Sequence, residues 1–328
     1  MKAQRSSLAG LFATLLLGAV GAVAAAQDEY PSRPVRMIVP FAPGGASDTV
    51  ARIIQSSMTE LFKQQVVVDN RGGAAGNIGV EAAVKANPDG YNFLLGNVGT
   101  MAINPVYYTK FPYKPLKDLI AVTQVVDVPG CLVVHPSLPA KNVKEVIAYL
   151  KSNPGKLNYG APAPSSANNL EMIMFMRATG TDAVQIAYKG GAGPAMIGLL
   201  GNEVQMMFVT FSSAVNFARQ GRVRMLGVIS PERNPALAEV PTMREQGLNM
   251  AVGSWQGLFL PKGTPQPVVN KLYQVGVDMM KDPLVVKRMG ESGITIVTSK
   301  SPAEFVALVK AETDRFGKAI KDANIPTE

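Results

Sequence analysis

A short apolar run, a glycine-rich turn and a helical pattern follow one another directly near the start of the chain. Residues 35–39 are mostly apolar, residues 40–45 hold two prolines and two glycines, and residues 50–61 carry apolar side chains at helical spacing. Because this order is typical of a strand and the crossover helix that leads to the next parallel strand, it predicts an α/β fold. Ligands of such open sheets bind beyond the carboxyl ends of the strands.

The same order recurs along the rest of the chain. Two longer apolar segments, residues 121–134 and 251–260, are predicted to be strands that cross between two domains. Those domains would be residues 27–127 plus 250–328 and residues 128–249, each a mostly parallel sheet flanked by helices, with the ligand cleft between them. The other predicted strands lie at residues 66–69, 91–95, 157–159, 184–187, 204–208 and 223–228, the predicted helices at 80–85, 143–150, 170–178, 195–200, 242–246, 268–280, 284–289 and 302–322, and a surface connection at 107–116.

The first 26 residues have the pattern of a secretory signal peptide. Lys2 and Arg5 precede an apolar stretch from Leu8 to Val23, and residues 24–26 are three alanines that offer a cleavage site. The apolar stretch is short for a membrane span. We therefore expect residues 1–26 to be removed on export, with a retained N-terminal anchor as the alternative.

The positive charge of the chain is small and diffuse. The formal net charge is +8, and +6 remains once Lys2 and Arg5 leave with the signal peptide. No run of five like charges and no basic cluster interleaved with aromatic residues occurs, so a nucleic-acid partner is not expected. A diffuse positive field favours encounters with small anions.

Chemistry-bearing residues are scarce. Cys131 is the only cysteine and lies in an apolar run, which favours a buried, inert thiol, and His135 is the only histidine. No signature of a serine hydrolase, a zinc peptidase or a nucleotide-binding loop is present, and we expect no metal, no cofactor and no catalytic residue. A carboxylate-processing hydrolase stays an alternative, for which Ser165 or Ser166 with the distant His135 would have to supply the nucleophile and base.

Glycine-rich loops before helices are the candidate binding elements. In the first of them, Ser47 and Asp48 stand where helix N-caps occur, and the exposed N–H groups with the helix dipole behind them form a small anion site. An ordinary strand-to-helix turn explains the same pattern. Similar loops occur at residues 70–79, 160–169 and 188–194, and small polar groups follow the third strand at residues 96–100.

Several of these segments together resemble a known family. The run Tyr30-Pro-Ser-Arg-Pro-Val35 followed by residues 38–48 is similar to the opening of the tripartite tricarboxylate transporter receptors, also called Bug-type solute-binding proteins. Further landmarks follow in the same order as in that family: Val67-Val-Asp-Asn-Arg71, Gly76-Asn-Ile-Gly79, Pro88-Asp-Gly-Tyr91, Val134-His-Pro-Ser-Leu-Pro139, Asn153-Pro-Gly-Lys-Leu157, Tyr188-Lys-Gly190, Met206-Met-Phe208 and Val240-Pro-Thr242. The resemblance covers residues 30–325.

The resemblance implies a two-domain periplasmic-binding-protein fold of type II that closes on a small carboxylate and delivers it to the permease subunits of a membrane transporter. We expect a periplasmic monomer, with a receptor that feeds a signalling partner as an alternative. Backbone amides of residues 41–48 would bind one carboxylate and residues 160–169 the far end of the ligand. The candidate ligand-binding residues are Phe41, Ala42, Gly44, Gly45, Ala46, Ser47, Asp48, Asn97, Thr100, Ser165, Ser166, Asn169, Tyr188 and Thr210.

Two positions depart from the family pattern and bear on the ligand. The family often has histidine where Asn169 stands and an acidic residue where Val209 stands. An ammonium group needs an acidic partner in a buried site, and Val209 removes one candidate. With Phe41, Phe211 and Trp255 as candidate apolar cover, we predict a mono- or dicarboxylate, aliphatic or aromatic, without an amino group.

Overall fold

The computed structural model describes residues 30–162, 165–250, 253–322, 325 and 327. The predicted signal peptide and residues 251–252 of the second predicted crossing strand lie outside them. Within the described ranges, no helix combines the length and the apolar character that a membrane crossing requires.

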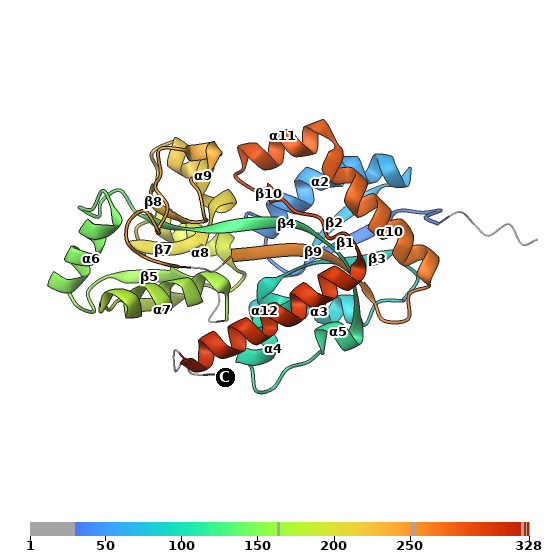
Figure 1. Cartoon of the computed structure of the whole chain (residues 1–328), viewed down its shortest axis with the longest axis horizontal. Helices are drawn as coiled ribbons and strands as arrows, with labels where there is room; N and C mark the ends of the chain where they lie inside the picture. The colour runs from blue at the N-terminus through green and yellow to red at the C-terminus, as the bar shows by residue number, and fades with distance from the viewer. Residues whose placement is uncertain (1–29, 163–164, 251–252, 323–324, 326, 328) are drawn as a thin grey trace, which may run out of the picture.

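One long strand joins two groups of elements, which we call the first lobe and the second lobe (Figure 1). The strand is β4 (Leu119–Val134). The first lobe holds β1 (Val35–Val39), β2 (Val66–Asn70), β3 (Asn92–Asn97), β9 (Gly253–Pro261), β10 (Thr295–Ile296), α2 (Ala46–Phe62), α3 (Asn77–Val84), α4 (Asn104–Tyr107), α5 (Pro115–Asp118), α10 (Gln266–Asp278), α11 (Pro283–Glu291) and α12 (Pro302–Asp322). It also holds the short 3-10 helices η1 (Ala74–Gly76) and η4 (Met279–Lys281) and the short π-helix η2 (Gly99–Ile103). The second lobe holds β5 (Asn158–Ala161), β6 (Val184–Ala187), β7 (Met206–Thr210), β8 (Arg224–Ile229), α6 (Val143–Ser152), α7 (Ala167–Thr179), α8 (Ala192–Leu200), α9 (Phe211–Arg219) and η3 (Pro235–Leu237).

Strand β4 changes partners about two-thirds of the way along its length. Residues 119–129 pair with β9 in the antiparallel sense, and residues 130–134 pair with β7 and β8. The change falls at Pro129 and Gly130, the dipeptide that interrupts the apolar run in the sequence. The predicted crossing strand is therefore present, and it is continuous.

Each lobe has a parallel group of strands with an antiparallel border. Strands β2, β1 and β3 are parallel in the first lobe, and β9 runs antiparallel to β3. Strands β6, β5 and β7 are parallel in the second lobe, and β4 runs antiparallel to β7. This mixed sheet with flanking helices confirms the α/β prediction, and it brings the carboxyl ends of β1, β3, β5 and β7 to the region between the lobes.

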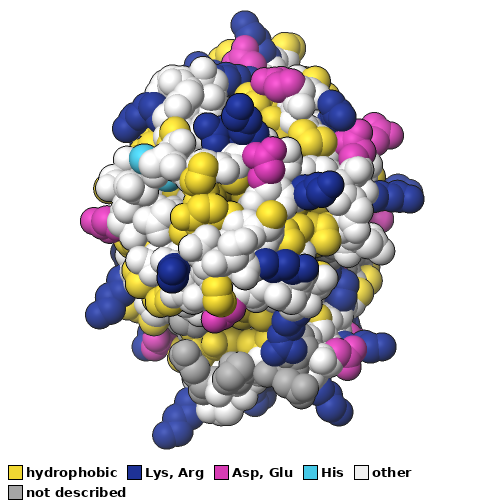
Figure 2. Space-filling view, turned by 90° about the vertical axis from the view of Figure 1, so that its left-hand side faces the viewer, with side chains coloured by type: hydrophobic (Ala, Val, Ile, Leu, Met, Phe, Trp, Pro, Cys, Tyr) yellow, Lys and Arg dark blue, Asp and Glu magenta, His cyan; other side chains and the backbone are white. Residues whose placement is uncertain are grey.

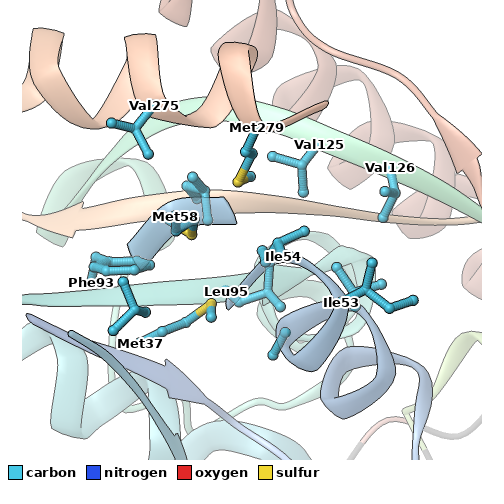
Figure 3. Close-up of a cluster of buried hydrophobic side chains, with 14 of the residues drawn as sticks. Met37, Ile53, Ile54, Met58, Phe93, Leu95, Val125, Val126, Val275 and Met279 are labelled. Atoms are coloured by element: carbon cyan, nitrogen blue, oxygen red, sulfur yellow. The ribbon is translucent and has the colours of Figure 1, made fainter. Parts of the chain in front are cut away.

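Helix α2 is held in the first lobe by its apolar face. Ile54 and Met58 are completely buried against Phe93 of β3, Val125 of β4 and Met279 (Figure 3). A buried side chain of this size contributes roughly 1.5–3 kcal/mol relative to an exposed one. Packing of this kind fixes the N-terminus of α2 at the end of β1.

Two connections differ from the sequence prediction. Tyr107 and Tyr113 are buried, although residues 107–116 were expected at the surface, because the Tyr113 hydroxyl donates to the Thr100 carbonyl at 2.9 Å beneath the first-lobe loops. Residues 242–246 form a turn rather than a helix, since the Thr242 backbone bridges to Val228 of β8. Neither tertiary contact can be read from local sequence.

Candidate functional site

A narrow cavity lies between the two lobes, beyond the strand ends of both. The space open to the centre of a water-sized sphere is about 70 Å³, which is room for several waters or one small ligand. Its described wall has no Lys, Arg, His, Asp or Glu and is made of Phe41, Gly45, Ala46, Ser47, Ala75, Asn97, Val98, Gly99, Asn104, Pro162, Ser165, Ser166, Ala167, Asn168, Gly191, Ala192, Thr210, Ser254 and Gln256. Electrostatic attraction between this wall and a charged ligand must therefore come from peptide and side-chain dipoles.

Four helices begin at this wall. The N-cap residues of α2, α7, α8 and α9 are Gly45, Ser166, Gly191 and Thr210, and all four line the cavity. The first N–H groups of a helix have no intrahelical acceptor, and the helix dipole adds about half a positive charge at that end. The converging N-termini therefore favour an anion although the wall carries no cation.

The first-lobe loop is shaped by Asp48. Its carboxylate accepts a hydrogen bond from the Gly44 N–H at 3.0 Å and is bound by the Arg52 guanidinium at 3.0 Å. Gly44 has a φ of +90°, a conformation that side-chain-bearing residues rarely adopt. Asp48 thus stabilises the turn from the side away from the cavity and does not line the cavity.

The two lobes touch around the cavity through small residues and polar contacts. The Ala42 N–H donates to the Gly190 carbonyl at 3.2 Å, and the Ser165 hydroxyl donates to the Asn104 side-chain oxygen at 2.7 Å. A Cβ atom at Gly193 would lie 2.5 Å from the Pro43 carbonyl oxygen. This close approach of two loops requires glycine, and it describes a closed arrangement of the lobes.

The model of the tripartite tricarboxylate transporter family receptors matches residues 50–325. The chain belongs to this family. The family consists of periplasmic solute-binding receptors, which confirms the predicted class and the prediction that the chain is not an enzyme.

Solved structures are similar to this receptor over most of its length. The periplasmic binding protein BugD is 36% identical, with a TM-score of 0.87 over 91% of this chain and 100% of that one. Rpa4515 of R. palustris with adipate is 31% identical, with a TM-score of 0.87 over 91% and 99%. MatC of Rhodopseudomonas palustris with bound malate is 31% identical, with a TM-score of 0.83 over 89% and 100%. These likenesses confirm the predicted periplasmic-binding-protein fold.

The cavity wall of the receptor contains a large part of the predicted site. Eight of the candidate residues line it: Phe41, Gly45, Ala46, Ser47, Asn97, Ser165, Ser166 and Thr210. Six do not: Ala42, Gly44, Asp48, Thr100, Asn169 and Tyr188. The first set comes from the ends of strands and the starts of helices in both lobes, which the fold brings together.

Two of the six residues outside the wall, Thr100 and Asn169, hold wall residues in place, whereas Tyr188 bonds to a residue away from the wall. Thr100 donates from its N–H and its hydroxyl to the Asn97 side-chain oxygen, at 3.0 and 3.2 Å. The Asn169 N–H donates to the Ser166 hydroxyl oxygen at 3.1 Å. The Tyr188 hydroxyl donates to Glu203 at 2.9 Å, and burial together with that carboxylate raises the pKa of Tyr188 to about 12.

Strand β9 supplies wall residues that the sequence analysis missed. Ser254 and Gln256 point to the cavity, whereas Trp255 between them packs edge-on against Phe305 of α12. The alternation of polar and apolar residues in an otherwise apolar strand was the available signal. Of the three aromatic residues considered as ligand cover, only Phe41 lines the cavity, and Phe211 is fully buried in the second lobe.

A buried carboxyl group lies behind the N-terminus of α7. Glu171 is only 1% exposed, and burial raises its pKa to about 8, although a hydrogen bond from the Asn168 amide at 2.9 Å opposes part of that rise. It contacts Gly130, where β4 passes between the lobes.

The neighbouring Cys131 is fully buried, as the sequence predicted, and burial raises its thiol pKa. No cluster of metal-binding side chains occurs in the ranges that the structure describes.

Proposed function

We propose that this receptor binds a small carboxylate anion in the cavity between its lobes and delivers it to the permease subunits of a tripartite tricarboxylate-type transporter. The observation that carries the proposal is the convergence of four helix N-termini on a cavity wall without charged side chains. Helix N-termini bind carboxylates and phosphates in this way. The adipate and malate in two similar proteins support the carboxylate class.

The first-lobe loop is the proposed anchor for one carboxylate. Ala46 and Ser47 open α2, and its N-cap Gly45 has no side chain that competes for the free N–H groups. The opposite end of the ligand would face the start of α7, where Ser165, Ser166 and the neighbouring residues line the wall. The remaining candidates, such as Asp48 and Asn169, hold these loops in place.

The cavity wall also supports the predicted ligand class. An ammonium group in a closed site requires a carboxylate or several acceptors to offset its desolvation. Asp48 is occupied by Arg52 and Gly44, and Val209 is fully buried in the second-lobe core. We therefore propose a mono- or dicarboxylate without an amino group.

The proposal includes export and lobe closure. Residues 1–26 would direct the chain to the periplasm, where a monomer of two domains, residues 27–127 plus 250–328 and residues 128–249, would close about β4 and the segment 250–260. The partner change at Pro129 and Gly130 supports a hinge there.

Lys and Arg side chains are spread over the outer face of the second lobe and alternate with acidic ones (Figure 2), which fits a diffuse field that attracts small anions.

Calorimetric titration of the unfolded, ligand-stripped and refolded receptor tests the proposal. The panel contains succinate, adipate, malate and benzoate, with aspartate and glutamate as the amino-acid set. We expect saturable binding of at least one compound of the first set and no turnover of it. Binding confined to aspartate or glutamate would overturn the ligand class, and the absence of any binding would overturn the carboxylate function.

A further inference from the structure

The side chain of Gln256 is an unpaired amide in the cavity wall. It is 0% exposed, and neither its oxygen nor its nitrogen has a hydrogen-bond partner among the described residues. A buried amide without partners is destabilising, so native structures rarely keep one without a reason. The unpaired amide therefore indicates a missing partner.

Other side-chain amides of the same wall each make at least one hydrogen bond within the protein. Asn104 donates to the Asn77 side-chain oxygen at 2.7 Å and accepts from the Ser165 hydroxyl. Asn168 donates to Glu171, and the Asn97 oxygen accepts from Thr100. Gln256 differs from all three, although it shares the cavity with them.

The strand holds the Gln256 side chain toward the cavity. Its backbone is in register with Asn97 on one side and Val126 on the other. Trp255 packs against Phe305, and a Cβ at Gly257 would also meet the Phe305 ring. Because side chains alternate along a strand, these contacts on the opposite face fix Gln256 on the cavity face.

We propose that Gln256 is the specificity-determining residue of the site and that it pairs with an uncharged donor–acceptor group of the ligand, either a hydroxyl or a carboxamide. The inference rests on the proposed carboxylate function and narrows it. An amide has both a donor and an acceptor, whereas a plain carboxylate offers acceptors only and leaves Oε1 of Gln256 unpaired. The ligand is therefore a carboxylate that carries a hydroxyl or carboxamide group, anchored by its anionic end at the helix N-termini.

Within the described part of the chain, the Gln256 amide lacks a partner in either of its two flipped orientations. Oxygen and nitrogen of a glutamine can be exchanged by a flip, but both positions lack a partner here. No cation lines the described wall to favour a second full negative charge. A neutral second group thus matches the wall better than a second carboxylate does.

Matched ligand pairs test the inference by calorimetry on the refolded receptor. The pairs are malate with succinate, succinamate with succinate, and adipic acid monoamide with adipate, each differing by one group. We expect the hydroxylated or amidated member of at least one pair to bind at least about tenfold more tightly, since a site that bonds a polar group rejects the analogue without it.

The variants Gln256→Leu and Gln256→Glu identify the residue responsible. Gln256→Leu should remove the preference within the pair while leaving the melting temperature of the ligand-free receptor unchanged or higher, because it deletes an unpaired buried amide. Gln256→Glu, of similar shape, should weaken every carboxylate at a pH high enough to ionise the introduced acid, because two anions then face each other, and burial raises the pKa of such an acid. The exposed Gln266→Leu on α10 is the matched control and should change neither property.

Each remaining outcome contradicts the inference in a recognisable way. If the wild-type receptor binds succinate or adipate as tightly as their hydroxylated or amidated partners, the carboxylate function stands and the proposed role of Gln256 is wrong. A preference that survives in Gln256→Leu shows that another group recognises the ligand and that water satisfies the amide. Failure of every compound to bind contradicts the proposed function itself.

Discussion

The start of α2 and the start of α7 face the same cavity from different lobes, and they are built in different ways. At α2 the N-cap is Gly45, and the acid of the loop, Asp48, is turned away toward Arg52. At α7 the N-cap Ser166 accepts from the Asn169 N–H, and Asn168 is tied to the buried Glu171. The first region offers free backbone donors, whereas the second offers side chains whose positions are fixed by other side chains. The difference indicates that α2 holds the charge of the ligand and that the opposite wall recognises the rest.

The largest expected effect is the loss of the backbone anchor in Gly45→Val. A Cβ at Gly45 would lie 3.8 Å from Ala192 across the cavity, so the branched methyl groups would fill the space beside the α2 N–H groups. We expect carboxylate affinity, measured by calorimetry, to fall roughly a hundredfold. The melting temperature of the ligand-free receptor should hardly change.

Gly290→Val on α11 is the matched control for this change, because no atom lies within 4 Å of a Cβ at Gly290. It should bind as wild type does. Undiminished binding by Gly45→Val would contradict the assignment of the charge to α2.

A smaller loss of affinity is expected for Gly193→Ala, which should hinder closure of the two lobes. The added methyl group would meet the Pro43 carbonyl oxygen at 2.5 Å, but only when the two loops are together. The closed state is therefore disfavoured, and affinity should fall roughly tenfold because closure contributes to binding. X-ray scattering should show a smaller ligand-induced decrease in the radius of gyration than wild type shows.

Gly201→Ala at the C-terminal end of α8 tests whether a methyl group elsewhere on that helix has the same effect, since a Cβ there meets only ordinary contacts of 3.5 Å or more. If Gly193→Ala closes and binds as wild type does, the contact between the two loops does not belong to the ligand-bound state.

The strands and helices could be predicted because their apolar periodicity is local. Residues 35–39 and 50–61 show their periods directly, and β4 crosses between the lobes where the apolar run is longest. The α2 loop was predictable for the same reason, since its glycines and helix start are contiguous. The structure was required to show that Ala42, Gly44 and Asp48 of this loop do not line the cavity.

The rest of the wall could not be predicted in the same way. Asn104 of α4 is held by Asn77 and Ser165, which are distant in sequence, and Gln256 comes from β9, a first-lobe strand far along the chain from α2. Trp255 attracted attention as the only tryptophan, but the strand alternation places it on the far face. Such residues become visible only through pairing and packing over long sequence separations.

The smallest expected effect concerns stability behind α7, in Glu171→Gln. The pKa of Glu171 is raised from its ordinary value of 4.5 to about 8, so the folded state retains a proton that the unfolded state loses between these values. Wild-type stability therefore decreases, through this group, as pH rises from 4.5 to 8. The melting temperature of Glu171→Gln minus that of wild type should increase over the same range.

The exposed Glu60→Gln on α2 should show no such trend. Carboxylate affinity of Glu171→Gln should stay close to wild type at pH 7, because a glutamine can still accept from Asn168. A constant melting-temperature difference between pH 5 and pH 8 would show that Glu171 is not held as the neutral acid.

Amide resonances of the helix N-termini test the central claim most directly. Ala46, Ala167 and Ala192 are the first residues of α2, α7 and α8, and all three line the cavity. The ¹⁵N-alanine-labelled receptor is titrated with a carboxylate whose binding calorimetry has established. The amide proton resonance of Ala46 should move downfield in proportion to occupancy, whereas the resonances of the exposed Ala148 and Ala303 should not move. If the Ala46 resonance of the saturated receptor moves no more than those of Ala148 and Ala303, the anion is bound elsewhere.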